Sequence, residues 1–95
     1  MTDSSSTQLA EVVVYTRQGC SYCSRLLGLL GQQGVRFTHH DLTGNQAKRD
    51  WLANVTGSST VPQMFINGTP VGGCTDVEAL HRSGKLAPLL AVANT

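Results

Sequence analysis

The chain has 95 residues, 40% of them hydrophobic, which is the size and composition of one small domain with a single compact core. Seven lysines and arginines stand against six aspartates and glutamates, and this net charge of +1 without any block of like charge argues against nucleic acid as a partner. Three cysteines are too few, and odd in number, for the disulfide framework of a small secreted domain.

The N-terminal segment, residues 1–9, is polar and rich in serine and threonine, and we expect it to form a flexible tail before one folded domain at 10–95. The segment has no basic region, no apolar run and no small-residue cleavage pattern, so we expect neither a signal peptide nor a membrane span. A cytoplasmic protein with no membrane partner is therefore predicted.

The first elements are predicted to be a strand and a helix. Val12-Val13-Val14-Tyr15 is a continuous β-branched and aromatic run that is too short for a helix, as is typical of a strand covered on both faces. A helix should follow it and end at Gly31 or Gly34. The apolar face of this helix has side chains at i, i+3, i+4 and i+7, which are Cys23, Leu26, Leu27 and Leu30.

A second strand and a second helix come next. Apolar and polar side chains alternate over residues 35–42, which predicts a strand. Thr43 or Asn45 can cap the helix that follows, and Gly57 is expected to end it. The apolar positions of this helix are spaced by four residues: Ala47, Val55 and, in the core or at its rim, Trp51.

A β-hairpin is predicted in the second half of the chain. Residues 64–66 and 69–71 flank Asn67-Gly68, a pair that readily adopts the positive φ angles of a tight turn. Pro70 has no N–H group, so the second strand of the hairpin should lie at an edge of the sheet.

The chain ends in a predicted helix followed by a shorter one. Thr75-Asp76-Val77-Glu78 matches a capping box, in which the side chains of Thr75 and Glu78 satisfy backbone donors at a helix start. Ser83-Gly84 should break this helix, and Pro88 suits the first turn of a short terminal one. The order is βαβαββα, and a parallel strand pair followed by an antiparallel hairpin predicts a four-stranded mixed sheet with helices on both faces.

Two cysteines separated by two residues, CSYC at 20–23, stand where the first strand should give way to the first helix. Cys20 would then lie at the helix N-terminus, where unpaired N–H groups and the helix dipole favour negative charge. Its thiol should ionise more easily, which makes Cys20 the expected attacking nucleophile. Cys23 follows one turn later on the buried leucine face, and we expect it to be the resolving thiol.

A zinc site is the main alternative for a CxxC pair. Such a site needs two more ligands, but the third cysteine stands alone at position 74. His39 and His40 would point to opposite faces of a strand, so at most one of them could join. The sequence therefore favours redox chemistry over a metal site and over two cysteines that merely pack.

Three short motifs, CSYC at 20–23, TVP at 60–62 and GGCTD at 72–76, together resemble the glutaredoxin family within the thioredoxin fold. The resemblance extends from about residue 12 to residue 90. It implies a thioredoxin-like α/β domain and a glutathione-dependent thiol–disulfide oxidoreductase. Such an enzyme would reduce protein disulfides and glutathione mixed disulfides through Cys20 and Cys23, with glutathione as reductant and disulfide-bonded or glutathionylated proteins as partners.

The resemblance also implies a glutathione-binding site. In the family the proline of TVP is cis, and the residue before it, here Val61, offers its backbone to the cysteine of glutathione. Gly72 would allow close approach of backbone and ligand, and the Asp76 carboxylate would receive the γ-glutamyl amine at a helix N-terminus. The binding residues implied by these two motifs are Thr60, Val61, Pro62, Gly73, Thr75 and Asp76.

Three further residues are assigned to the site by the resemblance. Arg17 and Arg49 occupy positions where family members place basic or amide groups, and they are expected to meet the glycyl carboxylate. For both arginines the alternative is a solvated surface charge. Tyr22 is expected to flank the sulfur, although an aromatic side chain there could equally be a packing residue.

One departure from the commonest family motif, CPYC, is that Ser21 replaces the proline. In the family a small residue here accompanies some members that hold a [2Fe–2S] cluster between two protomers, ligated by two catalytic cysteines and two glutathiones. A cluster-carrying dimer with Cys20 as ligand is therefore the alternative to a monomeric enzyme. A thioredoxin-like reductant is a third hypothesis, with little use for glutathione-binding residues. Cys74 is expected to be a free, partly buried thiol, with a regulatory disulfide or glutathionylation site as the minority interpretation.

Overall fold

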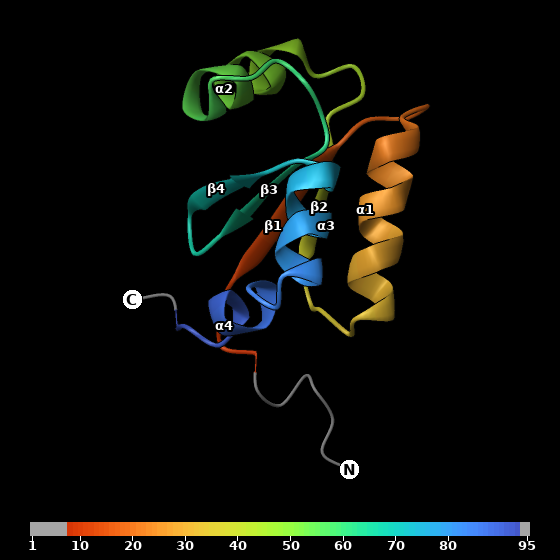
Figure 1. Ribbon diagram of the computed structural model, residues 1–95. Helices are drawn as coiled ribbons and strands as arrows, with labels where there is room; N and C mark the ends of the chain where they lie inside the picture. The colour runs from red at the N-terminus through yellow and green to blue at the C-terminus, as the bar shows by residue number, and fades with distance from the viewer. Residues whose placement is uncertain (1–7, 94–95) are drawn as a thin grey trace.

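The computed structural model describes residues 8–93 of the chain, and its elements follow the order βαβαββαα (Figure 1). The strands are β1 (Val12–Thr16), β2 (Thr38–Asp41), β3 (Gln63–Ile66) and β4 (Thr69–Gly72). The helices are α1 (Ser21–Gln32), α2 (Gln46–Thr56), α3 (Cys74–Arg82) and α4 (Leu86–Leu90). The short terminal helix expected at Pro88 is α4.

The N-terminal end of the described chain is part of the folded domain. Gln8 is 9% exposed, and its side-chain amide donates to the Arg36 carbonyl at 2.8 Å and accepts from the Arg36 N–H at 2.9 Å. Residues 8 and 9 of the expected tail are thus described with the domain, whereas residues 1–7 lie outside the described residues.

The strands form one mixed sheet in the order β2-β1-β3-β4. β1 runs parallel to β2 and antiparallel to β3, and β4 runs antiparallel to β3 at the edge of the sheet. The predicted mixed sheet is confirmed, and Pro70 lies in an edge strand as expected. β2 is shorter than the predicted strand at 35–42, because only residues 38–41 pair with β1.

Helices cover both faces of this sheet (Figure 1). On one face α1 and α3 pack side by side on β1 and β3, and on the other α2 packs through Leu52 against Tyr15 and Phe65. Fully burying one aliphatic side chain stabilises a fold by roughly 1.5–3 kcal/mol. The core on the α1 side of the sheet therefore holds this helix firmly against β1. The side chains at the centre of that core are fully buried: Val14, Leu26, Leu30, Met64 and Val77.

The apolar face of α2 differs from the prediction. Ala47 and Val55 are exposed, and Leu52 is the only buried residue of this fully described helix. Leu52 lies roughly 100° around the helix from Trp51, so the face that packs on the sheet is rotated away from the face marked by the four-residue spacing. Trp51, at 38% exposure, lies at the rim, where its ring stacks on Phe65 with centroids 6.2 Å apart.

The ends of α2 follow the expected signals. Asn45 caps the helix, since its side-chain oxygen accepts the Lys48 N–H at 3.0 Å. Gly57 ends it in the left-handed conformation with φ of 74°. Of the two caps considered from the sequence, Asn45 rather than Thr43 is therefore the one used.

The start of α3 corrects the predicted capping box. Gly73 is the N-cap, and the Asp76 carboxylate accepts the Gly73 N–H at 3.0 Å. Thr75 and Glu78 therefore do not form the box, and Glu78 instead pairs with Arg25 of α1. The pairs Gly73–Asp76 and Thr75–Glu78 both have the three-residue spacing of a capping box. The cap that forms begins at Gly73, and glycine has no capping side chain by which the sequence could identify it.

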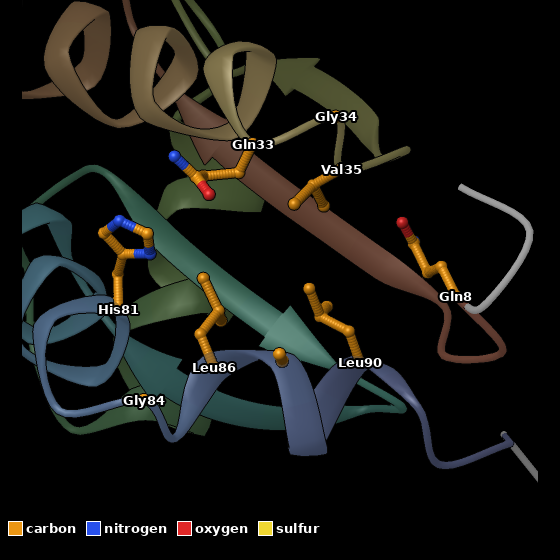
Figure 2. A pocket seen from close by; sticks show the side chains of 9 residues that line it. Gln8, Gln33, Gly34, Val35, His81, Gly84, Leu86 and Leu90 are labelled. Carbon is orange, nitrogen blue, oxygen red and sulfur yellow. The ribbon is translucent and has the colours of Figure 1, made fainter. Parts of the chain in front are cut away.

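A largely apolar cavity of about 360 Å³ lies at the C-terminal end of α1 (Figure 2). Leu86 and Leu90 of α4 and Val35 point into it, and the side chains of Gln33 and His81 face it from two sides. Because Cys20 precedes the opposite, N-terminal end of α1, this cavity is separate from the CSYC segment.

Candidate active site

Cys20 lies at the junction between β1 and α1. It is the N-cap of α1, with extended backbone angles, and its Sγ accepts the Cys23 N–H at 3.2 Å. The same sulfur lies 3.6 Å from the Val61 carbonyl oxygen, to which the protonated thiol donates. Of the three cysteines, all described and all free thiols, Cys20 alone is partly exposed. The helix N-terminus therefore presents a backbone N–H group to an accessible sulfur.

Cys23 occupies the opposite kind of environment one turn along α1. Its side chain is 3% exposed, and burial raises the pKa of this thiol to about 11, with smaller raising effects from the Cys20 hydrogen bond and charge. The backbone N–H of Arg17 partly offsets this rise. At neutral pH the Cys23 thiol is therefore protonated, so it is not suited to make the first attack.

The loop before β3 closes the space opposite Cys20. The Val61-Pro62 peptide bond is cis, as expected, and Pro62 is buried. This loop places the Val61 carbonyl beside the sulfur. Gln63, which follows in the chain, donates its side-chain amide to the Thr60 carbonyl at 3.1 Å. The hydrogen bond from Gln63 to Thr60 thus connects the two sides of the cis Val61-Pro62 bond, and it holds the loop in place opposite Cys20.

A first groove of about 570 Å³ runs from this loop to the N-terminus of α3. The structure brings together here all of the expected binding residues except Arg17 and Arg49. These are Tyr22, Thr60, Val61, Pro62, Gly73, Thr75 and Asp76. The groove also includes Thr56, Ser58 and Gln63, which the sequence reasoning did not identify.

Two glycines allow the end of this groove to form. Gly72 has φ of 110°, and a Cβ there would approach the Cβ of Asp76 to 2.7 Å. A Cβ on Gly73 would come within 3.0 Å of the Pro62 carbonyl oxygen. These glycines therefore allow a close approach between segments of the protein itself, which holds Asp76 and the cis-proline loop next to each other. The close approach of a ligand to them stays a prediction.

Arg25 supports the rim of the first groove. Its guanidinium lies 5.2 Å from the centroid of the Tyr22 ring, and its Nη2 lies 2.8 Å from both carboxylate oxygens of Glu78. The hydrogen bond from Arg25 holds the pKa of the Glu78 carboxyl below its usual range. One side chain thus contacts the aromatic ring at the groove and links α1 to α3.

A second groove of about 430 Å³ has Cys20 itself in its lining, whereas the first groove does not. Arg17 lines it together with both cysteines of the CSYC segment, whereas Arg49 lines neither groove. His39 and Asp41 of β2 also line it, and the sequence reasoning did not place them at the site. One sequence signal could have placed His39 there: the alternation of side chains along β2 puts His39 on the same face as the buried Val35.

Cys74 is the remaining thiol, at the start of α3. It is 3% exposed and lines the first groove. Burial is the main cause that raises its pKa, and the carboxylate of Glu78 adds to the rise. The expected free thiol is therefore found, but it is buried rather than partly buried. A regulatory disulfide or glutathionylation site stays the minority interpretation.

Comparison with known proteins assigns the family. A sequence profile of the glutaredoxin family matches residues 12–71. The chain belongs to the glutaredoxin family. Glutaredoxin 3 of Escherichia coli K12 is 44% identical over 82 residues, which cover 86% of this chain and 99% of that protein. A glutaredoxin of Pseudomonas aeruginosa is 48% identical over 80 residues, covering 84% of this chain and 95% of that protein.

Solved structures agree with this assignment. The chain superposes with a TM-score of 0.79 and 38% identity on a buckwheat glutaredoxin in complex with glutathione, covering 88% of this chain and 79% of that one. As a member of the glutaredoxin family, the chain has a thioredoxin-like fold and is a thiol–disulfide oxidoreductase. The family and the fold implied by the three sequence motifs are confirmed.

Candidate metal ligands do not cluster among the described residues. Among residues 8–93 no group of three or more His, Cys, Asp or Glu side chains lies close enough together to hold a metal ion. His39 bonds to Thr16, whereas His40 stacks on Tyr15 with centroids 5.3 Å apart, so the two rings point to opposite faces. Cys20 is the one accessible thiol of each copy, which is the single protein ligand per protomer that the cluster hypothesis uses, and the cluster-bound dimer stays a prediction.

None of the helices within residues 8–93 is both long enough and apolar enough to cross a membrane.

Proposed function

We propose that this chain is a glutathione-dependent oxidoreductase that reduces glutathione mixed disulfides through Cys20 and protein disulfides through Cys20 and Cys23. The observation that carries the proposal is the contrast between the two sulfurs. One is partly exposed at a helix N-terminus, where it lines the second groove and contacts Val61 of the first, and the other is 3% exposed one turn along the helix. An exposed nucleophile with a buried thiol one turn away is what a two-step disulfide exchange requires.

The first groove is the proposed binding site for glutathione. Its size and polar lining suit a tripeptide, and the similar buckwheat structure is a complex with glutathione. The N-terminus of α3 offers backbone N–H groups to the γ-glutamyl carboxylate near Thr75, and the Asp76 carboxylate receives the amine. Val61 offers its backbone to the cysteine of glutathione beside Cys20.

Arginines are the proposed partners of the glycyl carboxylate. Arg17 is exposed, lines the second groove with Cys20 and can hold a carboxylate by two parallel hydrogen bonds. Arg49 is half-buried on α2 and lines neither groove. It can therefore contact glutathione only if the ligand extends beyond the two grooves. We therefore assign the main role to Arg17.

Reduction of a glutathione mixed disulfide needs Cys20 alone. The Cys20 thiolate attacks the glutathione sulfur, a new S–S bond forms, the old one breaks, and the substrate leaves as a thiolate that takes up a proton. A second glutathione thiolate then attacks the glutathione sulfur on Cys20. This step releases oxidised glutathione and regenerates the Cys20 thiolate.

Reduction of a protein disulfide uses both cysteines. Cys20 forms a mixed disulfide with the substrate, and Cys23 attacks the Cys20 sulfur, which frees the substrate and leaves a Cys20–Cys23 disulfide. Two molecules of glutathione reduce this bond. Because the cycle depends on a reduced glutathione pool, we propose that the protein works in the cytoplasm. We propose that it acts as a monomer, since both cysteines of the cycle belong to one chain. Its proposed substrates are disulfide-bonded and glutathionylated proteins.

Substitution of each cysteine tests the proposal. Turnover is followed by coupling oxidised glutathione to its reductase, with a glutathionylated peptide and a disulfide-bonded protein as the two substrates. Cys20→Ser should abolish both activities. Cys23→Ser should keep deglutathionylation and lose most protein-disulfide reduction. Loss of deglutathionylation in Cys23→Ser, or activity retained in Cys20→Ser, would overturn the assigned roles.

A further inference from the structure

The side chain of Tyr22 lies at the rim of the first groove and is largely outside the core. Tyr22 follows Cys20 by two residues at the start of α1, lines the groove and is 52% exposed. A side chain that samples several rotamers must lose that freedom when a ligand packs against it, which weakens binding by about two- to tenfold. The contribution of Tyr22 to binding therefore depends on what holds its ring in place before the ligand arrives.

Arg25 contacts this ring from the same face of α1. It follows Tyr22 by three residues, a spacing that brings two side chains together on the surface of a helix. The central carbon of its guanidinium lies 5.2 Å from the centroid of the Tyr22 ring, which is within the range of a cation–π contact. The ring at the groove therefore has a charged neighbour on its own helix.

Glu78 of α3 anchors the guanidinium. Nη2 of Arg25 donates to both carboxylate oxygens of Glu78 at 2.8 Å. The side chain of Glu78 is 23% exposed, against 53% for Arg25, so the carboxylate is the more enclosed partner of the pair. Glu78 follows Asp76 by two residues on the helix whose N-terminus lines the groove. The ion pair therefore ties the Tyr22 side of the groove to the Asp76 side.

We propose that Arg25, held by Glu78, is a positioning residue that keeps the Tyr22 ring in place at the rim of the first groove, so that glutathione binds against a preformed wall. The inference rests on the proposed binding of glutathione in this groove. Arg25 lines neither groove, so it acts on the ligand through Tyr22. A contact made equally with bound substrate and transition state changes KM and leaves kcat unaltered.

Two alternative roles of the ion pair predict different kinetics. If the pair only joins α1 to α3, its loss should leave KM unchanged, because Leu26 and Val77 of the shared core already hold the two helices and an exposed ion pair adds little stability. If Arg25 instead attracts the glutathione carboxylates directly, removal of the Glu78 charge should lower KM. Positioning predicts that removal of either partner raises KM.

Steady-state kinetics of the glutathione-coupled assay, with a glutathionylated peptide as substrate, measures the effect. Arg25→Met keeps an unbranched apolar side chain and removes the charge, whereas Glu78→Gln removes the anchor. Each should raise KM by about two- to tenfold while kcat stays the same. Arg82→Met is the matched control, because Arg82 is an exposed arginine of α3 that lines neither groove, and its KM should equal that of the wild type.

Removal of the ring tests whether Arg25 acts through it. In a Tyr22→Ala background, Arg25→Met should cause no further rise in KM, since two residues that act as one unit do not have additive effects. In a Tyr22→Phe background, which keeps the ring, the rise should persist.

Three results would overturn the inference: an unchanged KM in Arg25→Met, a lowered or unchanged KM in Glu78→Gln, or an equal effect of Arg25→Met with and without the ring. A rise in Arg82→Met as large as that in Arg25→Met would do the same, because it would indicate a general effect of charge. Failure of the proposed glutathione site would look different, since Asp76→Ala would then also leave KM unchanged.

Discussion

At the scale of single residues, position on one helix gives two cysteines different chemistry. The N-cap position of Cys20 leaves its sulfur partly exposed and in reach of the Cys23 N–H at 3.2 Å. Cys23, on the buried face of the same helix, is 3% exposed and has its pKa raised to about 11. One sulfur is therefore held ready to attack, while the other stays protonated until the first has reacted.

Charged residues of the site should affect substrate binding more than the chemical step. Asp76→Ala and Arg17→Ala each remove one charge-assisted contact to glutathione, so each should raise KM for a glutathionylated peptide by about tenfold while kcat changes little. Steady-state kinetics of the glutathione-coupled assay measures this split. Asp50→Ala, an exposed acid of α2 outside both grooves, is the matched control. Unchanged KM in both site variants would remove the proposed pocket.

Backbone conformation at Gly72 offers a second test at the residue scale. Gly72→Ala would place a methyl group against the side chain of Asp76, so it should raise KM as Asp76→Ala does and should lower the free energy of unfolding by about 1–3 kcal/mol. Gly28→Ala is the control, because a methyl group there meets no atom within 4 Å and favours the helix by roughly 0.5–1 kcal/mol. Urea denaturation that finds the two variants equally stable would contradict this account.

At the scale of elements, α2 is attached to the sheet by few contacts. Leu52 is its only buried residue, and Trp51 covers the rim. Leu52→Ala should therefore lower the free energy of unfolding by about 2–4 kcal/mol, whereas Val55→Ala should change it by less than about 0.5 kcal/mol. Chemical denaturation of both variants decides. A larger loss from Val55→Ala would favour the face predicted from the four-residue spacing.

Elements with strong local signals were predictable from the sequence. The β-branched run gave β1, Asn67-Gly68 gave the hairpin turn, and Gly57 gave the end of α2. The start of α3 was not predictable, because Gly73 and Thr75 both begin a pair with capping-box spacing. Which of the two pairs forms the cap depends on the backbone conformation at Gly72. Local patterns fail where two overlapping signals are resolved by packing.

At the scale of the whole molecule, the site exists because distant segments meet at one end of the sheet. The end of β1, the N-terminus of α1, the cis-proline loop and the N-terminus of α3 all contribute. Family motifs, rather than periodicity, allowed TVP and GGCTD to be placed next to CSYC. Thr16 and His39 were missed because their meeting depends on the parallel register of β1 and β2, which no local pattern specifies.

Burial of Cys23 should also make the stability of the whole fold depend on alkaline pH. The folded state holds this thiol protonated to about pH 11, whereas the unfolded chain releases the proton near its ordinary pKa of 9.0. The contribution is therefore complete below pH 9 and is lost as pH rises to 11, by roughly 2 kcal/mol. Urea denaturation of the reduced protein measures the slope. Cys23→Ser should show a smaller fall, and an equal fall in both proteins would contradict the assignment.

Cys20 alone is expected to be an accessible, activated nucleophile. The direct measurement is the rate of iodoacetamide alkylation of each cysteine in the reduced protein at neutral pH, with the sites identified by peptide mass spectrometry. Cys20 should react at least about tenfold faster than Cys23, Cys74 and the cysteine of an unstructured peptide. A Cys20 that reacts no faster than that peptide, or a Cys23 that reacts as fast as Cys20, would contradict the account.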